Sequence, residues 1–103
     1  MIGNVPDILP FKVSRQVALG IIRGAVAASR VGFAQHARAR MKKRRISVEQ
    51  VMVCLEKGRI SEGPYLDIKG YWRCTMERLV AGDELQVVVA FNSRESVVVV
   101  TTM

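Results

Sequence analysis

The spacing of apolar residues changes once along the chain, at Gly58, and this change limits the fold more than any other feature. Before Gly58, apolar residues recur every three or four positions, which is typical of helices that bury one side. After it, apolar and polar residues alternate, which is typical of strands. A chain of 103 residues has the length of one domain. We therefore predict an α+β fold, with N-terminal helices on one face of a C-terminal antiparallel sheet of three to four strands.

Three helices are expected in the first half. Ser14 can cap a helix that runs to about Arg30, and a second helix spans Gln35–Arg44. The third has the clearest signals, because Ser47 with the residue three positions later forms a capping box and Gly58 stops the helix.

Strands are expected from Arg59 onward. Arg59–Glu62 is a short candidate, and residues 64–70 are expected to form a loop. Tyr71–Leu79, Leu85–Phe91 and Val97–Thr102 are separated by short turns, so they should form an antiparallel meander.

The chain divides into three parts on these grounds. Residues 1–13 form an irregular leader, residues 14–31 an added N-terminal helix, and residues 32–103 a single α+β domain. Gly20 and Gly24 would allow a partner element to approach the added helix closely, which suggests a homodimer through residues 14–31.

Positive charge is concentrated in the first half, although the net charge of the whole chain is +7. From Glu49 to the end, acids outnumber bases. Between Ile8 and Val48 there is no acid, whereas the bases there are Lys12, Arg15, Arg23, Arg30, Arg38, Arg40, Lys42, Lys43, Arg44 and Arg45. A patch of this kind attracts polyanions, most simply nucleic acid or an acidic protein.

Other classes of protein are disfavoured. No apolar run approaches the ~18–20 residues that span a membrane. Cys54 and Cys74 lie in different elements, as small buried hydrophobes do in a reducing, cytoplasmic protein. A single histidine and the lack of a CxxC motif disfavour a structural zinc site, and we expect no cofactor.

One set of residues has the spacing of a phosphate-directed site. His36, Arg40 and Arg44 form a row on the predicted helix, away from the Ala37/Met41 side. An imidazole can transfer protons at neutral pH, and guanidiniums bind phosphate through paired donors. Cleavage of RNA through its 2′-hydroxyl requires these groups and no metal.

A simpler interpretation stays open beside this one. A lone histidine near a helix start is commonly a cap or a surface group, and a run such as Arg38–Arg45 is commonly a solvated face. Tyr65 and Tyr71 could supply a second proton-transfer group or could be packing residues. The remaining bases of the run contribute general attraction to polyanions: Arg38, Lys42, Lys43 and Arg45.

The segment FAQHARARMKKRRIS at Phe33–Ser47 resembles the opening signature of a bacterial family known as domain of unknown function 4258. That signature is roughly His-Ala-x-x-Arg-Met-x-x-Arg-x-Ile-Ser/Thr. A helix that ends at Gly58 and a Val-Val-Thr run at Val99–Thr101 also agree with it. The resemblance covers about two-thirds of the chain.

The layout of this family is similar to the α+β fold of RelE-like ribonuclease toxins, which implies cleavage of RNA. The resemblance implies functional roles for His36, Arg40, Arg44 and, on the last strand, Thr101, with Arg73 as a less secure match. Arg45 departs from the small residue expected at its position.

Two functions are therefore expected. The first is a metal-independent, toxin-like ribonuclease, with His36 as acid and base and arginines on the phosphate. The alternative is a non-catalytic basic module that binds nucleic acid or an acidic, antitoxin-like protein. Groove reading by a helix-turn-helix is disfavoured, since its recognition helix would carry Glu49 and Glu56.

Overall fold

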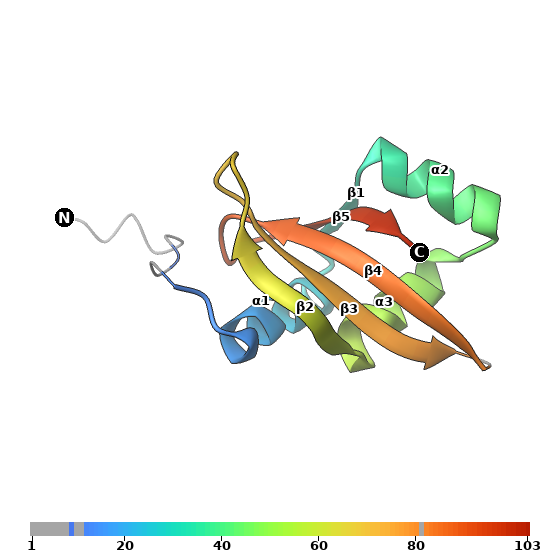
Figure 1. Cartoon of the computed structure of the whole chain (residues 1–103), viewed down its shortest axis with the longest axis horizontal. Coiled ribbons are helices and arrows are strands. Elements are labelled where there is room, and N and C mark those ends of the chain that lie inside the picture. The colour runs from blue at the N-terminus through green and yellow to red at the C-terminus, as the bar shows by residue number, and fades with distance from the viewer. Residues whose placement is uncertain (1–8, 10–11, 81) are drawn as a thin grey trace.

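The structure is a computed structural model that describes residues 9, 12–80 and 82–103, and the grey trace in Figure 1 marks the rest. Most of the predicted leader, residues 1–13, lies outside the described residues. The elements in chain order are α1 (Arg15–Ala27), β1 (Val31–Phe33), α2 (Gln35–Arg44), α3 (Val48–Lys57), β2 (Arg59–Leu66), β3 (Trp72–Val80), β4 (Asp83–Phe91) and β5 (Val97–Thr102).

Local signals place the helices. The Ser14 hydroxyl accepts from the Val17 backbone N–H at 3.1 Å and caps α1. The capping box of α3 is present in full, with Ser47 Oγ accepting from Gln50 N and Gln50 Oε1 accepting from Ser47 N. Gly58 caps the end of α3. These three predictions are confirmed, because each depends on residues within one helical turn of the boundary.

The α+β class is confirmed, but the described residues form a sheet of five strands in the order β1-β5-β4-β3-β2. Strands β2 to β5 form the antiparallel meander, and β1 pairs with β5 in parallel through Val31↔Val97. Strand β2 continues to Leu66, so the loop predicted over residues 64–70 is wrong in its first half. Pro64 is tolerated because β2 is an edge strand. An edge strand pairs with one neighbour only, so a residue without a backbone N–H can stand where no strand needs that donor.

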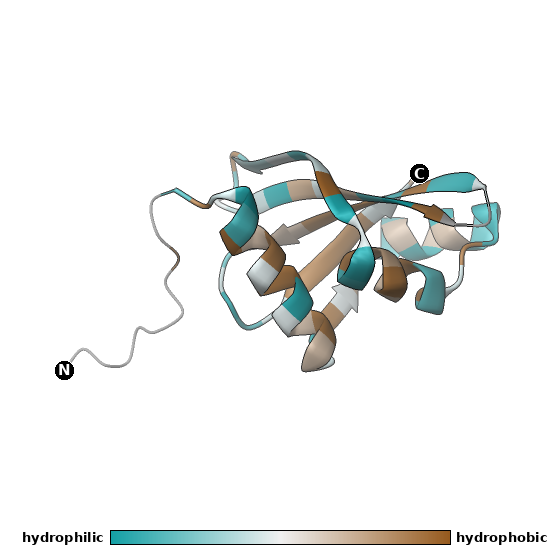
Figure 2. Ribbon diagram, turned by 90° about the horizontal axis from the view of Figure 1, so that it is seen from below, coloured by the Kyte–Doolittle hydropathy of each residue, from teal (hydrophilic) through white to brown (hydrophobic). Residues whose placement is uncertain are grey.

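The sheet is one layer and α1 with α3 a second, while no helix of the described residues covers the opposite face of the sheet (Figures 1 and 2). Helix α2 lies beside β5 rather than beneath the sheet. The core lies between the two layers and contains the largest fully buried side chains, among them Ile22, Leu55, Met76, Val87 and Phe91.

Helix α1 belongs to this same core. Ala18 and Ile22 are fully buried, and two arginines attach the helix to its neighbours. Arg15 donates to the backbone carbonyls of Gly63 and Ile60 in β2, at 2.8 and 3.2 Å. A homodimer through residues 14–31 stays a prediction, and it would have to use the exposed face of α1.

Arg23 of α1 forms hydrogen bonds with the C-terminal end of α3. Its Nε donates to Glu56 O at 2.9 Å and its Nη2 to Gly58 O at 3.1 Å. These carbonyls lie at the C-terminal end of α3, where backbone acceptors lack partners within the helix. Arg23 therefore supplies a side-chain cap for a helix that is distant in sequence.

Both cysteines are buried and neither forms a disulfide. Burial raises the pKa of the Cys54 thiol to about 11 and that of Cys74 to about 12. Each thiol is therefore a protonated, apolar part of the core at neutral pH. In the part of the chain that the structure describes, no helix has the length and hydrophobicity to cross a membrane.

Candidate nucleic-acid interface

Helix α2 carries the predicted row of functional residues, and β5 fixes its position. The backbone N–H of Ala34, the N-cap residue, donates to Val99 O of β5 at 2.9 Å. Ala37 and Met41 are buried, as the spacing predicts, and they hold α2 against the sheet. The outward sides of the helix are left to polar and charged residues.

The helix ends at Arg45, which adopts the left-handed conformation with φ 57° and ψ 43°. Glycine or asparagine is favoured at such a C-cap, since a Cβ there costs roughly 1 kcal/mol. This conformation explains why a small residue is expected at this position. The Ile46 N–H then donates to Met41 O at 2.9 Å and closes the last turn.

The members of the row have different surroundings. With a rise of ~1.5 Å per residue, His36 and Arg44 lie about 12 Å apart along the helix axis. His36 is exposed, and within the described residues its side chain makes no hydrogen bond or ion pair. Arg40 is half-buried, and its Nε donates to Thr102 O of β5 at 3.5 Å. Arg44 is exposed at the end of the helix.

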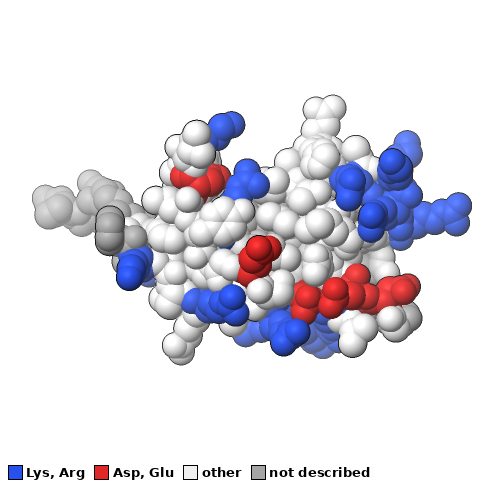
Figure 3. All heavy atoms as spheres, viewed as in Figure 1, with Lys and Arg blue, Asp and Glu red and all other residues white. Residues whose placement is uncertain are grey.

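We call the cations of α2 and its C-cap the α2 basic surface: Arg38, Arg40, Lys42, Lys43, Arg44 and Arg45. No acid lies in α2, and neither ion pair found among the described residues, Arg59–Glu77 or Arg73–Asp67, involves this surface. Figure 3 shows lysines and arginines gathered at the end of the molecule that α2 occupies. The Arg38 guanidinium also lies over the Phe33 ring, 5.6 Å from its centroid.

Arg73 lies apart from this surface and has a structural partner. Its Nε donates to Asp67 Oδ2 at 2.9 Å, while Asp67 Oδ1 accepts from the backbone N–H groups of Lys69 and Tyr71. These hydrogen bonds, first that from Tyr71 and then that from Arg73, lower the pKa of the Asp67 carboxyl. Arg73 thus helps to order the turn between β2 and β3. Tyr65 and Tyr71 are both exposed near this turn.

Thr101 lies on the face of the sheet that no helix covers. Thr101 in β5 pairs with Val88 of β4, whereas Arg73 in β3 pairs with Ala90 of β4. With strands ~4.8 Å apart and a rise of ~3.4 Å per residue, the Cα atoms of Thr101 and Arg73 are about 12 Å apart. The predicted residues therefore divide into the row on α2 and two positions on the uncovered face of the sheet, Thr101 in β5 and Arg73 in β3.

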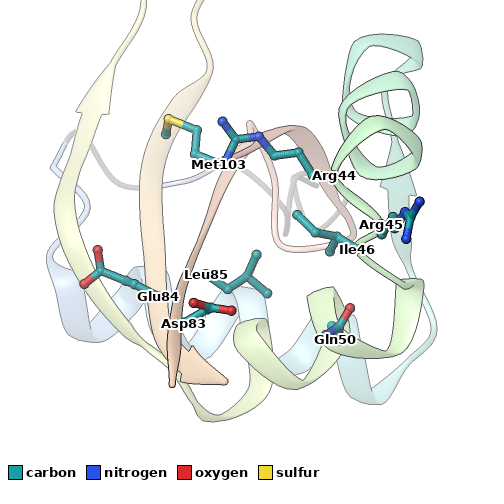
Figure 4. A pocket seen from close by; sticks show the side chains of 8 residues that line it. All are labelled: Arg44, Arg45, Ile46, Gln50, Asp83, Glu84, Leu85 and Met103. Atoms are coloured by element: carbon teal, nitrogen blue, oxygen red, sulfur yellow. The ribbon is translucent and has the colours of Figure 1, made fainter. Parts of the chain in front are cut away.

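A pocket of about 430 Å³ opens where α2 ends (Figure 4). Of the predicted site residues it contains Arg44, and its other walls come from the α2–α3 link, α3, β4 and the chain end. Its full lining is Arg44, Arg45, Ile46, Gln50, Asp83, Glu84, Leu85 and Met103.

Sequence reasoning did not select Asp83 or Gln50 as site residues. The pocket forms because the start of β4 pairs with the end of β5, with Gln86 and Met103 exchanging backbone hydrogen bonds of 3.1 and 2.8 Å. These segments are far apart in sequence, so no local pattern marks them. No group of three or more histidine, cysteine, aspartate or glutamate side chains suited to a metal ion occurs among the described residues.

Comparison with known proteins gives one family. No curated protein and no solved structure matches the chain significantly. Residues 33–103 match the model of the family described as Domain of unknown function (DUF4258). This match spans about two-thirds of the chain, from β1 to the end of the sheet. The chain therefore belongs to that family.

Proposed function

We propose that the protein binds single-stranded RNA through the α2 basic surface. The observation that carries this proposal is that six cations lie on one short helix and its cap, without an acid or an ion pair among the described residues. Cations that are not neutralised within the protein can take phosphates as partners and release the counterions of the nucleic acid. Arg40, Arg44 and Arg45 add paired donors suited to phosphate oxygens.

The arrangement of α3 argues against reading a duplex groove. Val51, Cys54 and Leu55 bury one side of α3 in the core, and Glu49 and Glu56 are on its exposed side. A recognition helix would bring these carboxylates toward the DNA backbone. RNA is favoured over DNA by the resemblance of the motif at residues 33–47 to a family whose layout is similar to that of RelE-like ribonuclease toxins.

Charge reversal on α2 tests the binding surface. Lys42 and Lys43 are exposed, and no hydrogen bond or ion pair ties them to other described residues. In Lys42→Glu/Lys43→Glu we expect a fall of tenfold or more in affinity for a fluorescent RNA heptamer, measured by anisotropy. If both lysines contact phosphates, the log–log slope of affinity against salt should fall by about 1.4, at ~0.7 per single-strand contact.

The control is a double variant with the same change in net charge elsewhere, Lys57→Glu/Lys69→Glu. It should lose much less affinity, because these residues lie at the end of α3 and in the β2–β3 turn. An equal loss in both double variants would mean that the net charge alone attracts RNA, and would contradict the proposal. Binding of an acidic protein with no measurable binding of RNA would favour the alternative partner.

A second candidate function is metal-independent cleavage of the bound RNA, favoured by the position of His36. Its imidazole is exposed in the first turn of α2, in one row with Arg40 and Arg44. It could accept the proton of a 2′-hydroxyl as that oxygen attacks phosphorus, and return it to the departing 5′-oxygen. The product would be a 2′,3′-cyclic phosphate, and the two arginines would stabilise the developing oxyanion.

His36→Ala separates the two functions. If the protein is a ribonuclease, this variant loses cleavage and any growth arrest on expression, yet keeps most of its affinity for RNA. Cleavage that is retained in His36→Ala, after purification identical to that of the wild type, would rule out His36 as the acid and base. Binding without cleavage in both proteins would leave the RNA-binding function alone.

A further inference from the structure

The pocket at the end of α2 carries opposite charges that do not neutralise each other. Arg44 forms one wall and the start of β4, with Asp83, forms another. Figure 4 shows the Arg44 side chain extending across the opening toward Met103, whereas the Arg45 side chain points away. Within the described residues, neither Arg44 nor Asp83 has an ion-pair partner. A ligand that meets both groups must present an anion and, separated from it, a hydrogen-bond donor.

The neighbouring carboxylate does not share this position. Glu84 Oε1 accepts from the Gln86 side chain at 3.4 Å, and Figure 4 shows the Glu84 side chain directed to the other side of β4 from Leu85. Asp83 is thus the acid whose side chain is left for a ligand, and Glu84 borders the pocket without offering it an unengaged carboxylate.

Gln50 adds a donor of fixed direction. Its Oε1 accepts from Ser47 N at 2.8 Å in the capping box of α3. The amide group can therefore offer the pocket its Nε2 hydrogens, while its oxygen stays committed to the cap. Ile46, Leu85 and Met103 supply apolar surface between the polar groups.

We propose that this pocket binds one nucleobase that bears an exocyclic amino group, next to a phosphate held by Arg44. The proposal rests on the RNA-binding function and assigns base selectivity to the same site. Asp83 accepts a hydrogen bond from the amino group, as carboxylates do with cytosine N4. Gln50 donates to a base acceptor, and the apolar side chains cover the base plane. A volume of about 430 Å³ falls in the range of ligand pockets and accommodates a base with part of its ribose.

Cytosine and uracil provide the sharpest comparison, since they have the same size and differ on one edge, at N3, which carries a hydrogen only in uracil, and at position 4. Cytosine presents an amino donor there, whereas uracil presents a carbonyl oxygen that would face the Asp83 carboxylate. The full chain should bind a uridine heptamer with one central cytidine about tenfold more tightly than the all-uridine heptamer, within the range for one well-made base contact. Anisotropy at fixed salt measures both affinities.

Asp83→Asn tests the residue that is responsible. Asparagine keeps the shape but can donate as well as accept, so the cytidine preference should fall to near unity. The ratio of the two affinities is the readout, because the lost negative charge raises the affinity for both oligomers alike. Glu84→Gln removes the same charge one residue away and should leave the ratio unchanged.

A second measurement avoids dependence on the longer RNA. Cytidine monophosphate should shift the NMR methyl signals of Ile46 and Leu85 in the wild type more strongly than uridine monophosphate, and this difference should vanish in Asp83→Asn. RNA that binds without preference for cytidine would overturn the inference and leave the proposed function standing. A preference that survives Asp83→Asn would overturn it as well. If neither heptamer binds, both the inference and the proposed function fail.

Discussion

Alanine at Gly58 and alanine at Gly24 should change the free energy of unfolding in opposite directions. A Cβ on Gly58 would lie 2.5 Å from Cys54 O and 2.7 Å from Glu77 O, and both are backbone atoms. Cys54 O accepts the capping hydrogen bond from Gly58 N at 2.8 Å, and Glu77 is paired with Arg59 between β2 and β3. Neither carbonyl can move without disturbing the end of α3 or the β2–β3 ladder.

The expected loss in the free energy of unfolding of Gly58→Ala follows from these two backbone contacts. Overpacking a rigid site costs about 1–3 kcal/mol, and two backbone obstacles place Gly58→Ala at the upper end of that range. The smaller entropy of the unfolded alanine chain returns roughly 0.4–1 kcal/mol, so the net loss is about 2 kcal/mol. Gly24 lies inside α1, and apart from its neighbours and the helix backbone no atom of the described residues lies within 4 Å of a Cβ placed there, so Gly24→Ala should gain about 0.5–1 kcal/mol in the free energy of unfolding.

Urea unfolding followed by circular dichroism measures both changes. In a domain of this size 1 kcal/mol corresponds to roughly 4–8 °C in Tm, so the two variants should melt at least about 10 °C apart. A Gly58→Ala variant as stable as the wild type would refute the close approach of α3 to β3. A Gly24→Ala variant that is less stable only at high protein concentration would instead indicate a dimer through the exposed face of α1.

Two further substitutions test single contacts. The Thr102 Oγ1 is buried without a hydrogen-bond partner among the described residues, so Thr102→Val should raise the free energy of unfolding by about 1 kcal/mol or more. Thr101→Val, on the uncovered face, should not raise it. Equal changes in Tm for the two variants would contradict this expectation. The pKa of Asp67 lies below its ordinary value because of the Tyr71 and Arg73 hydrogen bonds. The ionised carboxylate therefore stabilises the β2–β3 turn above about pH 4. This stabilisation is lost as the pH falls through the pKa that Asp67 has in the folded protein. The protection of the turn amides from exchange, relative to the intrinsic exchange rate at each pH, should fall across that interval, and this fall should be absent in Asp67→Asn.

The errors in predicting the sheet have a common physical origin. The caps of α1 and α3 are local, so the sequence near Ser14 and Ser47 contains their signals. The extension of β2 through Pro64 depends on pairing with β3. Strand β1 exists because Val31 meets Val97, which lies near the other end of the chain. In both cases the partner that orders the strand lies outside the segment itself, so three to four strands were predicted where the described residues form five.

The candidate site could likewise be predicted only as far as its local sequence pattern allows. The row of His36, Arg40 and Arg44 follows from helical period alone, and the structure places it on α2 as expected. The ion pair of Arg73 and the pocket that Arg44 shares with Asp83 both depend on the meander. Helical spacing could therefore identify a surface, but not the groups from the sheet that meet it.

The basic residues of the first half divide into two groups that sequence cannot separate. Arg15, Arg23 and Arg40 donate to backbone carbonyls of other elements. A guanidinium bound to a carbonyl keeps its charge, so it still adds to the long-range field that attracts a polyanion. Those engaged donors are not available to a phosphate at the same time. Attraction is therefore spread over the whole first half, whereas contact is concentrated toward the end of α2, where the exposed Lys42 and Lys43 precede Arg44 and Arg44 lines the pocket.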